Sequence, residues 1–182
     1  MEKLISFFHT VGKLKTTKRA GWLNYKIEES ESIAEHSHRT ALLAMIFAKR
    51  FGADELRTIK MALLHDLAEA VTGDIITERG EEAVYSREQK LKKEQGAIEE
   101  ILIDLDAQEK EELLSLWLEG ENGESPEAKL ARQLCKLEMA MQAFEYEKEN
   151  PSQKLDEFFI VAKKYVQDEK LQKLLEELLS KR

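Results

Sequence analysis

The stretch Met61-Ala62-Leu63-Leu64-His65-Asp66-Leu67-Ala68-Glu69 sets a histidine–aspartate pair into an apolar segment with helical spacing. The flanking residues predict burial, and burying an imidazole beside a carboxylate is costly unless both groups are compensated. One divalent metal ion would compensate both. Glu69 comes one helical turn after His65, so a continuous helix would point both side chains the same way. A metal with a carboxylate beside it is an arrangement that activates water, and the stretch therefore predicts a hydrolase.

Two further segments extend this pattern, Ala34-Glu35-His36-Ser37 before the stretch and Gly73-Asp74 after it. His36, on an earlier helix, can supply a third metal ligand. The competing interpretation is that a histidine on an apolar helix is a hydrogen-bonded core residue, and spacing alone leaves both interpretations open. His9 and His38 are expected to be ordinary helix residues, because His38 is two positions from His36 and points elsewhere.

Helical periodicity covers nearly the whole chain, which has only two prolines and no long alternation of apolar and polar residues. Ser32 with Glu35 forms a predicted capping box, Asp54 a predicted cap, and Ser125-Pro126 a helix start. We expect one all-α domain over residues 1–182. Its helices are expected at about 4–14, 32–51, 54–73, 84–103, 107–119, 126–149, 153–167 and 170–180.

Composition narrows the classes of function. The net charge is −8, which argues against a nucleic-acid polymer as partner. Cys135 is the only cysteine, which fits a reducing compartment and an expected cytoplasmic location. No apolar run approaches the roughly 20 residues of a membrane span, and the N-terminal residues do not resemble a signal peptide.

At these residues the chain resembles the HD-domain phosphohydrolases, and more closely the HD-domain 5′-deoxynucleotidases, which release phosphate from deoxynucleoside 5′-monophosphates. Four segments carry the resemblance: Glu31–Ser37, His65–Ile75, Arg132–Met139 and Glu145–Glu147. A bare His-Asp pair would be weak support. The glutamate and the Gly-Asp that follow it make the central segment specific.

The resemblance implies a role for each site residue. His36, His65 and Asp66 would ligate a divalent metal, and Glu69 would position or deprotonate the attacking water. The substrate residues would be Arg19 for the phosphate, Trp22 near the base and Asp74 at the sugar hydroxyl.

Other interpretations of the three substrate residues stay open. Arg19 in a basic turn is equally consistent with a solvated charge, and Trp22 is more simply a packing residue. Asp74 after a glycine can merely cap a turn.

Cys135 is the one departure from the family pattern, which has an aspartate as its fourth ligand there. A thiolate has the same charge as a carboxylate and binds zinc and other soft-tolerant metals, so manganese, cobalt and zinc are all candidates. Alternatively, Cys135 is a small buried apolar residue. Glu138, one turn later, could also reach the site.

Three functions follow from these observations. The first, which the resemblance implies, is a metal-dependent phosphomonoesterase that hydrolyses deoxynucleoside 5′-monophosphates to deoxynucleoside and phosphate. The second is an HD-type phosphohydrolase of another nucleotide class, and the third is a helical binding protein with an altered metal site.

The resemblance further implies a homodimer. A leucine stripe on the last predicted helix fits either the protein's own core or a subunit interface.

Overall fold

The computed structural model describes residues 1–76 and 85–182, in which every regular element is helical. The predicted all-α fold is confirmed. The α-helices are α1 (Glu2–Gly12), α2 (Ala20–Leu23), α3 (Ile33–Phe47), α4 (Glu55–Leu64), α5 (Glu69–Thr72), α6 (Arg87–Ile101), α7 (Ala107–Asn122), α8 (Pro126–Glu149), α9 (Asp156–Tyr165) and α10 (Glu169–Ser180). Short 3₁₀ turns follow three of them, at Lys13–Lys15, Ala48–Phe51 and Leu102–Asp104.

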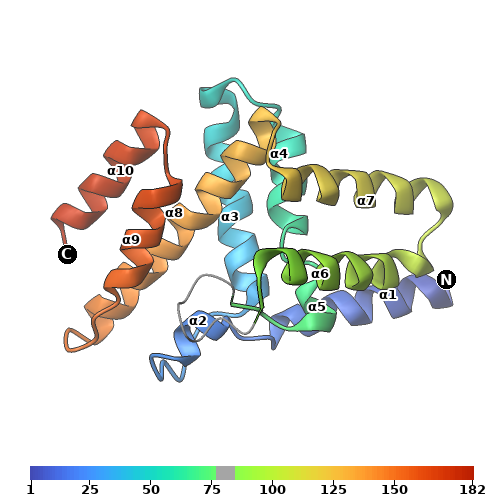
Figure 1. Ribbon diagram of the computed structural model, residues 1–182, viewed down its shortest axis with the longest axis horizontal. Coiled ribbons are helices and arrows are strands. Elements are labelled where there is room, and N and C mark those ends of the chain that lie inside the picture. The colour runs from blue at the N-terminus through green and yellow to red at the C-terminus, as the bar shows by residue number, and fades with distance from the viewer. Residues whose placement is uncertain (77–84) are drawn as a thin grey trace.

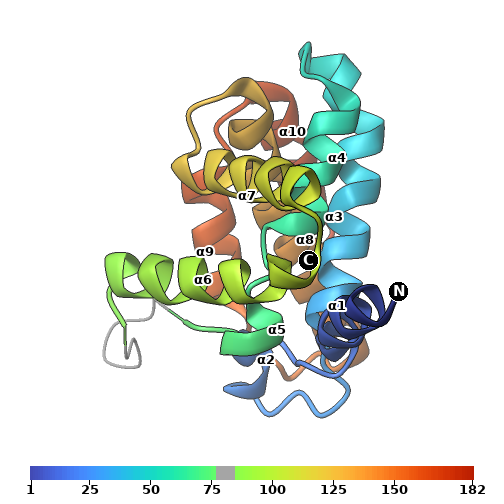
Figure 2. The same cartoon turned by 90° about the vertical axis from the view of Figure 1, so that its right-hand side faces the viewer.

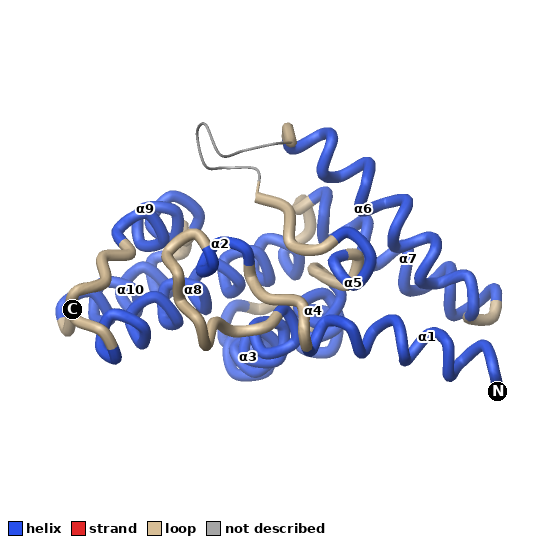
Figure 3. Tube along the Cα trace, turned by 90° about the horizontal axis from the view of Figure 1, so that it is seen from below, coloured by secondary structure: helices blue, strands red, loops and turns tan. Residues whose placement is uncertain are grey.

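Helices α3, α4 and α8 form the middle of the molecule and contact one another pairwise. Figure 1 shows α9 and α10 on one side of this centre and α1, α6 and α7 on the other. The perpendicular view in Figure 3 shows the same separation, with the C-terminal helices at one end and α1 reaching out at the other. Figure 2 shows α6 and α7 side by side, and the two helices are in contact.

Two apolar cores correspond to these two sides. The larger core unites α3, α4 and α8–α10, with Leu134, Leu137 and Leu171 fully buried. The smaller core unites α1, the start of α3, the residues around α5, and α6 and α7, with Ile98 and Leu102 fully buried. Residues that lie between the two cores are therefore located where several helices meet.

The predicted helix starts are confirmed by their capping hydrogen bonds. Ser32 Oγ accepts a hydrogen bond from Glu35 N, and Ser32 N donates the reciprocal bond of a capping box to Glu35 Oε2. Asp54 accepts from Arg57 N at 2.7 Å, and Ser125 accepts from Ala128 N at 3.2 Å. These bonds satisfy backbone donors that the first turn of a helix leaves unpaired.

The helix expected from Asp54 to near Gly73 is interrupted, and that expectation is wrong. Helix α4 ends at Leu64 and α5 begins only at Glu69. The intervening residues are joined by tight turns, such as Leu67 N to Leu64 O at 3.0 Å. Other boundaries differ less: α7 runs on to Asn122, and the predicted start at residue 84 lies outside the described residues.

The leucine stripe of α10 packs on the protein's own larger core. Leu171 and Leu175 are buried, and three neighbours are partly buried against the same core, namely Leu174, Leu178 and Leu179. Within residues 1–76 and 85–182, no helix is both long and apolar enough to cross a membrane.

Candidate active site

The two histidines expected to be ligands meet where the two cores join. His36 lies fully buried on α3, and His65 caps the end of α4. Their Nε2 atoms are 3.2 Å apart. Two nitrogen lone pairs at this distance repel each other unless a proton or a cation lies between them. By contrast, His9 and His38 are exposed, which agrees with their interpretation as ordinary helix residues.

A backbone carbonyl decides which nitrogen of His65 faces this meeting point. Nδ1 donates to the carbonyl oxygen of Ala62 at 2.8 Å, since a carbonyl can only accept. The lone pair is thereby left on Nε2, the atom that faces His36. A histidine that ligates a metal commonly has its other nitrogen fixed in this way. The same bond occupies a carbonyl of the last turn of α4, at the point where the helix stops.

A carboxylate with no role predicted from the sequence orients His36. Glu138 of α8 is fully buried, and its Oε2 accepts a hydrogen bond from His36 Nδ1. Arg39 Nε donates to the other oxygen of Glu138 at 2.9 Å, and Arg39 Nη1 pairs with Glu145 at 2.7 Å. Glu138 therefore turns His36 Nε2 toward His65. The only signal in the sequence was its place one turn after Cys135.

Asp66 and Cys135 bring two more donor atoms to the histidines. Asp66 Oδ2 lies 3.0 Å from His65 Nε2 and 3.8 Å from His36 Nε2. Cys135 Sγ, from α8, lies 3.4 Å from His36 Nε2. Ligand atoms of one tetrahedral zinc ion are about 3.3–3.6 Å apart, given the usual bond lengths. The ligand atoms of His36, His65 and Cys135 all lie within 4.8 Å of one another, so these three residues could share a single ion, with Asp66 beside the two imidazoles.

The charges of the cluster also fit a cation. Burial opposes ionisation of the Cys135 thiol, yet Lys136 and His36 hold its pKa well below the ordinary value. Burial and Arg19 lower the pKa of His36, but Glu138 and Cys135 outweigh them and raise it to about 9. Anionic groups thus favour positive charge where the imidazoles meet. Two imidazoles, a carboxylate and a thiolate suit zinc and its neighbours among the divalent metals.

Arg19 reaches this cluster from the segment before α2. Its Nη1 donates to Asp66 Oδ2 at 3.1 Å, and both side chains are 14% exposed. Burial opposes charge on Asp66, but His65 and Arg19 keep its pKa well below the ordinary range. The guanidinium is therefore positioned beside the cluster, with Asp66 as its partner.

Glu69 opens α5, so the expectation that it shares a helical face with His65 is wrong. It nevertheless lines the same cavity. Its Oε1 lies 3.3 Å from Lys90 Nζ of α6, and its buried Oε2 has no hydrogen-bond partner among the described residues. Burial, with Asp66 and Asp74 nearby, raises the pKa of Glu69 well above its ordinary value.

Asp74 also lines the cavity, just after Gly73, whose φ of +70° favours glycine. Its Oδ2 accepts a hydrogen bond from the backbone N–H of Ala20 at 2.8 Å. Because Ala20 follows Arg19, this bond fastens the arginine segment to the end of α5.

Trp22, expected near the base, lies in the larger core and does not line the cavity. It is 1% exposed and stacks on Phe158 with ring centres 3.9 Å apart. Its indole nitrogen donates to Glu31 Oε1 at 2.9 Å. A large ring whose one polar atom is satisfied is a typical packing residue.

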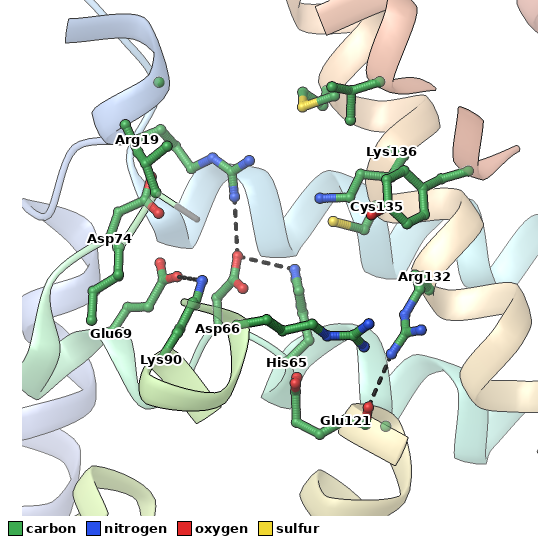
Figure 4. Close-up of a pocket in the computed structure, with 18 of the residues that line it drawn as sticks. Arg19, His65, Asp66, Glu69, Asp74, Lys90, Glu121, Arg132, Cys135 and Lys136 are labelled. Atoms are coloured by element: carbon green, nitrogen blue, oxygen red, sulfur yellow. Dashed lines mark hydrogen bonds and ion pairs between the residues drawn. The ribbon is translucent and has the colours of Figure 1, made fainter. Parts of the chain in front are cut away.

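A cavity of about 490 Å³ lies in front of these groups, a size typical of small-molecule sites. Figure 4 shows Arg19, Asp74, Glu69 and Lys90 on one side of the His65–Asp66 pair and Cys135, Lys136 and Arg132 on the other. Apolar residues of α8 and α9 complete the wall, among them Met139, Phe158 and Val161.

A family model for the HD domain matches residues 11–177 of the chain. The chain belongs to the HD-domain family. A protein of Dictyostelium discoideum named 5′-deoxynucleotidase HDDC2 is 38% identical over 87% of each chain. A protein of Schizosaccharomyces pombe named 5′-deoxynucleotidase hdd1 is 35% identical over 98% of this chain and 90% of its own. The resemblance stated from the sequence is thereby confirmed.

Solved structures of other proteins share the fold of this chain. The crystal structure of the PH0347 protein from Pyrococcus horikoshii is 32% identical and covers 97% of this chain and 96% of its own, with a TM-score of 0.77. A conserved hypothetical protein from Pyrococcus furiosus is 28% identical over 97% of this chain and 99% of its own, with a TM-score of 0.76.

Proposed function

We propose that this protein is a metal-dependent 5′-deoxynucleotidase that releases phosphate from deoxynucleoside 5′-monophosphates. The observation that carries the proposal is the cluster of His36, His65, Asp66 and Cys135 beside a cavity large enough for a mononucleotide. The relatives named 5′-deoxynucleotidases supply the substrate class. Arg19, Glu69 and Asp74 line the same cavity and supply groups suited to each part of such a substrate.

The four residues of the cluster would hold one divalent metal ion. Such an ion polarises a phosphoryl oxygen and lowers the pKa of water bound to it. The chain prepares the site by fixing the imidazoles in advance: the Ala62 carbonyl and the Glu138 carboxylate each hold one Nδ1. Holding both imidazole rings with their Nε2 atoms facing each other limits the reorganisation that metal binding would otherwise require.

Three other side chains act on the substrate. The Arg19 guanidinium binds the phosphate, because its planar fork donates two hydrogen bonds at once. In its ionised form Glu69 accepts a proton from the attacking water at Oε2, since this atom is buried at the cavity and has no other described partner. Asp74 contacts the sugar hydroxyl and favours the deoxyribose substrate.

Cys135 biases the choice of metal. Sulfur is softer than a carboxylate oxygen, so the cluster should favour zinc or cobalt and bind manganese less well. We expect Cys135→Asp to raise manganese affinity and to lower the preference for zinc. Calorimetry with each metal measures this directly, and equal affinities in both proteins would contradict a ligand role for the thiol.

A phosphate-release screen over nucleotides, run with zinc, cobalt and manganese, tests the function. Release from deoxynucleoside monophosphates in preference to ribonucleoside monophosphates supports the proposal. Faster hydrolysis of another phosphoester would favour a different HD-type phosphohydrolase. If no phosphate is released with any of the metals, a helical binding protein would be the better interpretation.

Assembly and location are also proposals. We propose a homodimer, supported by exposed apolar side chains on the outer face of α3, Leu42, Met45 and Ile46. Light scattering of the purified protein gives its mass in solution. A single buried cysteine supports a reducing, cytoplasmic environment.

A further inference from the structure

Lys90 is a cationic side chain in the cavity that the proposed chemistry leaves without a role. It lies near the start of α6, and its Nζ is 3.3 Å from Glu69 Oε1 and 3.3 Å from Glu94 Oε1. Its side chain is 24% exposed, and those of the two glutamates are 1% and 7% exposed. Lys92 and Lys93, on the same helix, are exposed. Lys90 thus differs from its neighbours in being drawn inward between two buried carboxylates.

Burying a charged lysine at this position costs folding free energy. A lysine near the N-terminus of a helix opposes the helix dipole, and its burial opposes its charge. Burial lowers the pKa of Lys90, but Glu69 and Glu94 outweigh it and raise the pKa above its ordinary value, so the ammonium stays charged. The smaller core also packs α6 against α5, through Ala97 and Ile98 on one helix and Ala70 on the other. The lysine and Glu69 are therefore held in a fixed relation.

The two oxygens of Glu69 have different surroundings. Oε1 is engaged by Lys90, whereas Oε2 is buried without a described partner. We propose that Lys90, anchored by Glu94, is a positioning residue that holds Glu69 Oε1 and so presents Oε2 to the attacking water. This inference rests on the proposed role of Glu69 in hydrolysis. The competing possibility is that Lys90 binds the substrate phosphate directly, as Arg19 is proposed to do.

Steady-state kinetics separates the two roles. If Lys90 acts through Glu69, Lys90→Met should lower kcat about 10–100-fold, the order expected from a misplaced catalytic group, and leave KM nearly unchanged. Lys90→Arg should restore much of the loss, and Lys92→Met, the matched control, should behave as the unaltered protein. Glu94→Gln should lower kcat in the same direction but less. A rise in KM with kcat unchanged would assign Lys90 to phosphate binding and overturn the proposal.

A double-mutant cycle makes the test stricter. In a Glu69→Gln background, Lys90→Met should have little further effect on kcat, because the group it positions is already gone. Independent, multiplying losses would contradict the proposal. Bound metal, measured by elemental analysis, should be the same in all these variants. Circular dichroism should likewise show unchanged helix content.

A nuclear magnetic resonance measurement needs no turnover, so it tests the pairing of Lys90 with Glu69 even if the proposed substrate class is wrong. In protein labelled with ¹³C-glutamate, the signal of the Glu69 carboxyl carbon is identified as the one that is absent from the spectrum of Glu69→Gln. The chemical shift of this signal should change in Lys90→Met and stay the same in Lys92→Met. A signal unmoved by Lys90→Met would overturn the pairing itself, whereas a failed nucleotide screen would overturn only the substrate.

Discussion

The site has a ligand half and a reaction half, and the two differ in what fixes their side chains. The ligand half is the set of proposed metal ligands, His36, His65, Asp66 and Cys135, and the reaction half is the set of residues proposed to act on the substrate, Arg19, Glu69 and Asp74. Each histidine of the ligand half is oriented by a group outside the cavity, a backbone carbonyl for one and the buried Glu138 for the other.

The reaction half is held by pairs that lie in the cavity itself. Arg19 pairs with Asp66, and Glu69 with Lys90. A substrate phosphate must therefore compete with Asp66 for the guanidinium. Both histidines of the ligand half are therefore oriented before any ligand arrives, whereas Arg19 must leave Asp66 in order to bind a substrate phosphate.

The largest expected effect breaks the ligand half. His65→Ala removes one of the two converging Nε2 atoms, so stoichiometric metal and phosphate release should be lost together. Elemental analysis and the release assay, with circular dichroism as a check on the fold, measure the outcome. Full retention of metal would show that His65 is not a ligand.

A large but separable effect is expected in the reaction half. Glu69→Ala should keep the metal and lower turnover by roughly 10²–10⁴-fold, the range typical of a lost general base. Metal content and kcat are measured on the same preparation. Unimpaired turnover would exclude Glu69 from the chemistry.

A smaller effect tests whether the ligand half is really pre-arranged. Glu138→Gln weakens the group that orients His36, and we expect metal affinity to fall about 10–100-fold. Titration calorimetry measures this, and Glu145→Gln, at the exposed end of the same Arg39 network, is the matched control. Equal losses in both variants would point to a general weakening of the contact between α3 and α8.

The smallest expected effect concerns the choice of sugar. Asp74→Asn keeps an oxygen that can accept from Ala20 N but removes the charge, so the arginine segment should stay in place. We expect the ratio of deoxyribose to ribose turnover to fall by about 10-fold at most, with metal binding unchanged. A ratio equal to that of the unaltered protein would leave Asp74 with its capping role alone.

Local signals in the sequence predicted much of this architecture. Ser32, Asp54 and Ser125 mark helix starts because each caps its own first turn, and such bonds span only three residues. The break after Leu64 could not be predicted in this way. The apolar pattern runs on through it, and the structure shows a side chain bonded to a backbone carbonyl at that point.

The residues that support the site were harder to predict than its proposed ligands. Glu138 and Lys90 look like ordinary charged residues of helices, and their partners lie 102 and 21 positions away. Cys135 could be placed from the family pattern, and its sulfur does lie against His36. The resemblance implies a place near the base for Trp22, but the structure supports the alternative interpretation, because this large apolar side chain is buried in the core.

The stacking of Trp22 on Phe158 also has a practical use. Phe158 lines the cavity, so its neighbour is an optical reporter built into the protein. The chain has one other tryptophan, Trp117, in the smaller core, and Trp117→Phe would leave emission from Trp22 alone. Nucleotide titrations could then be followed by intrinsic fluorescence, without a label and without turnover.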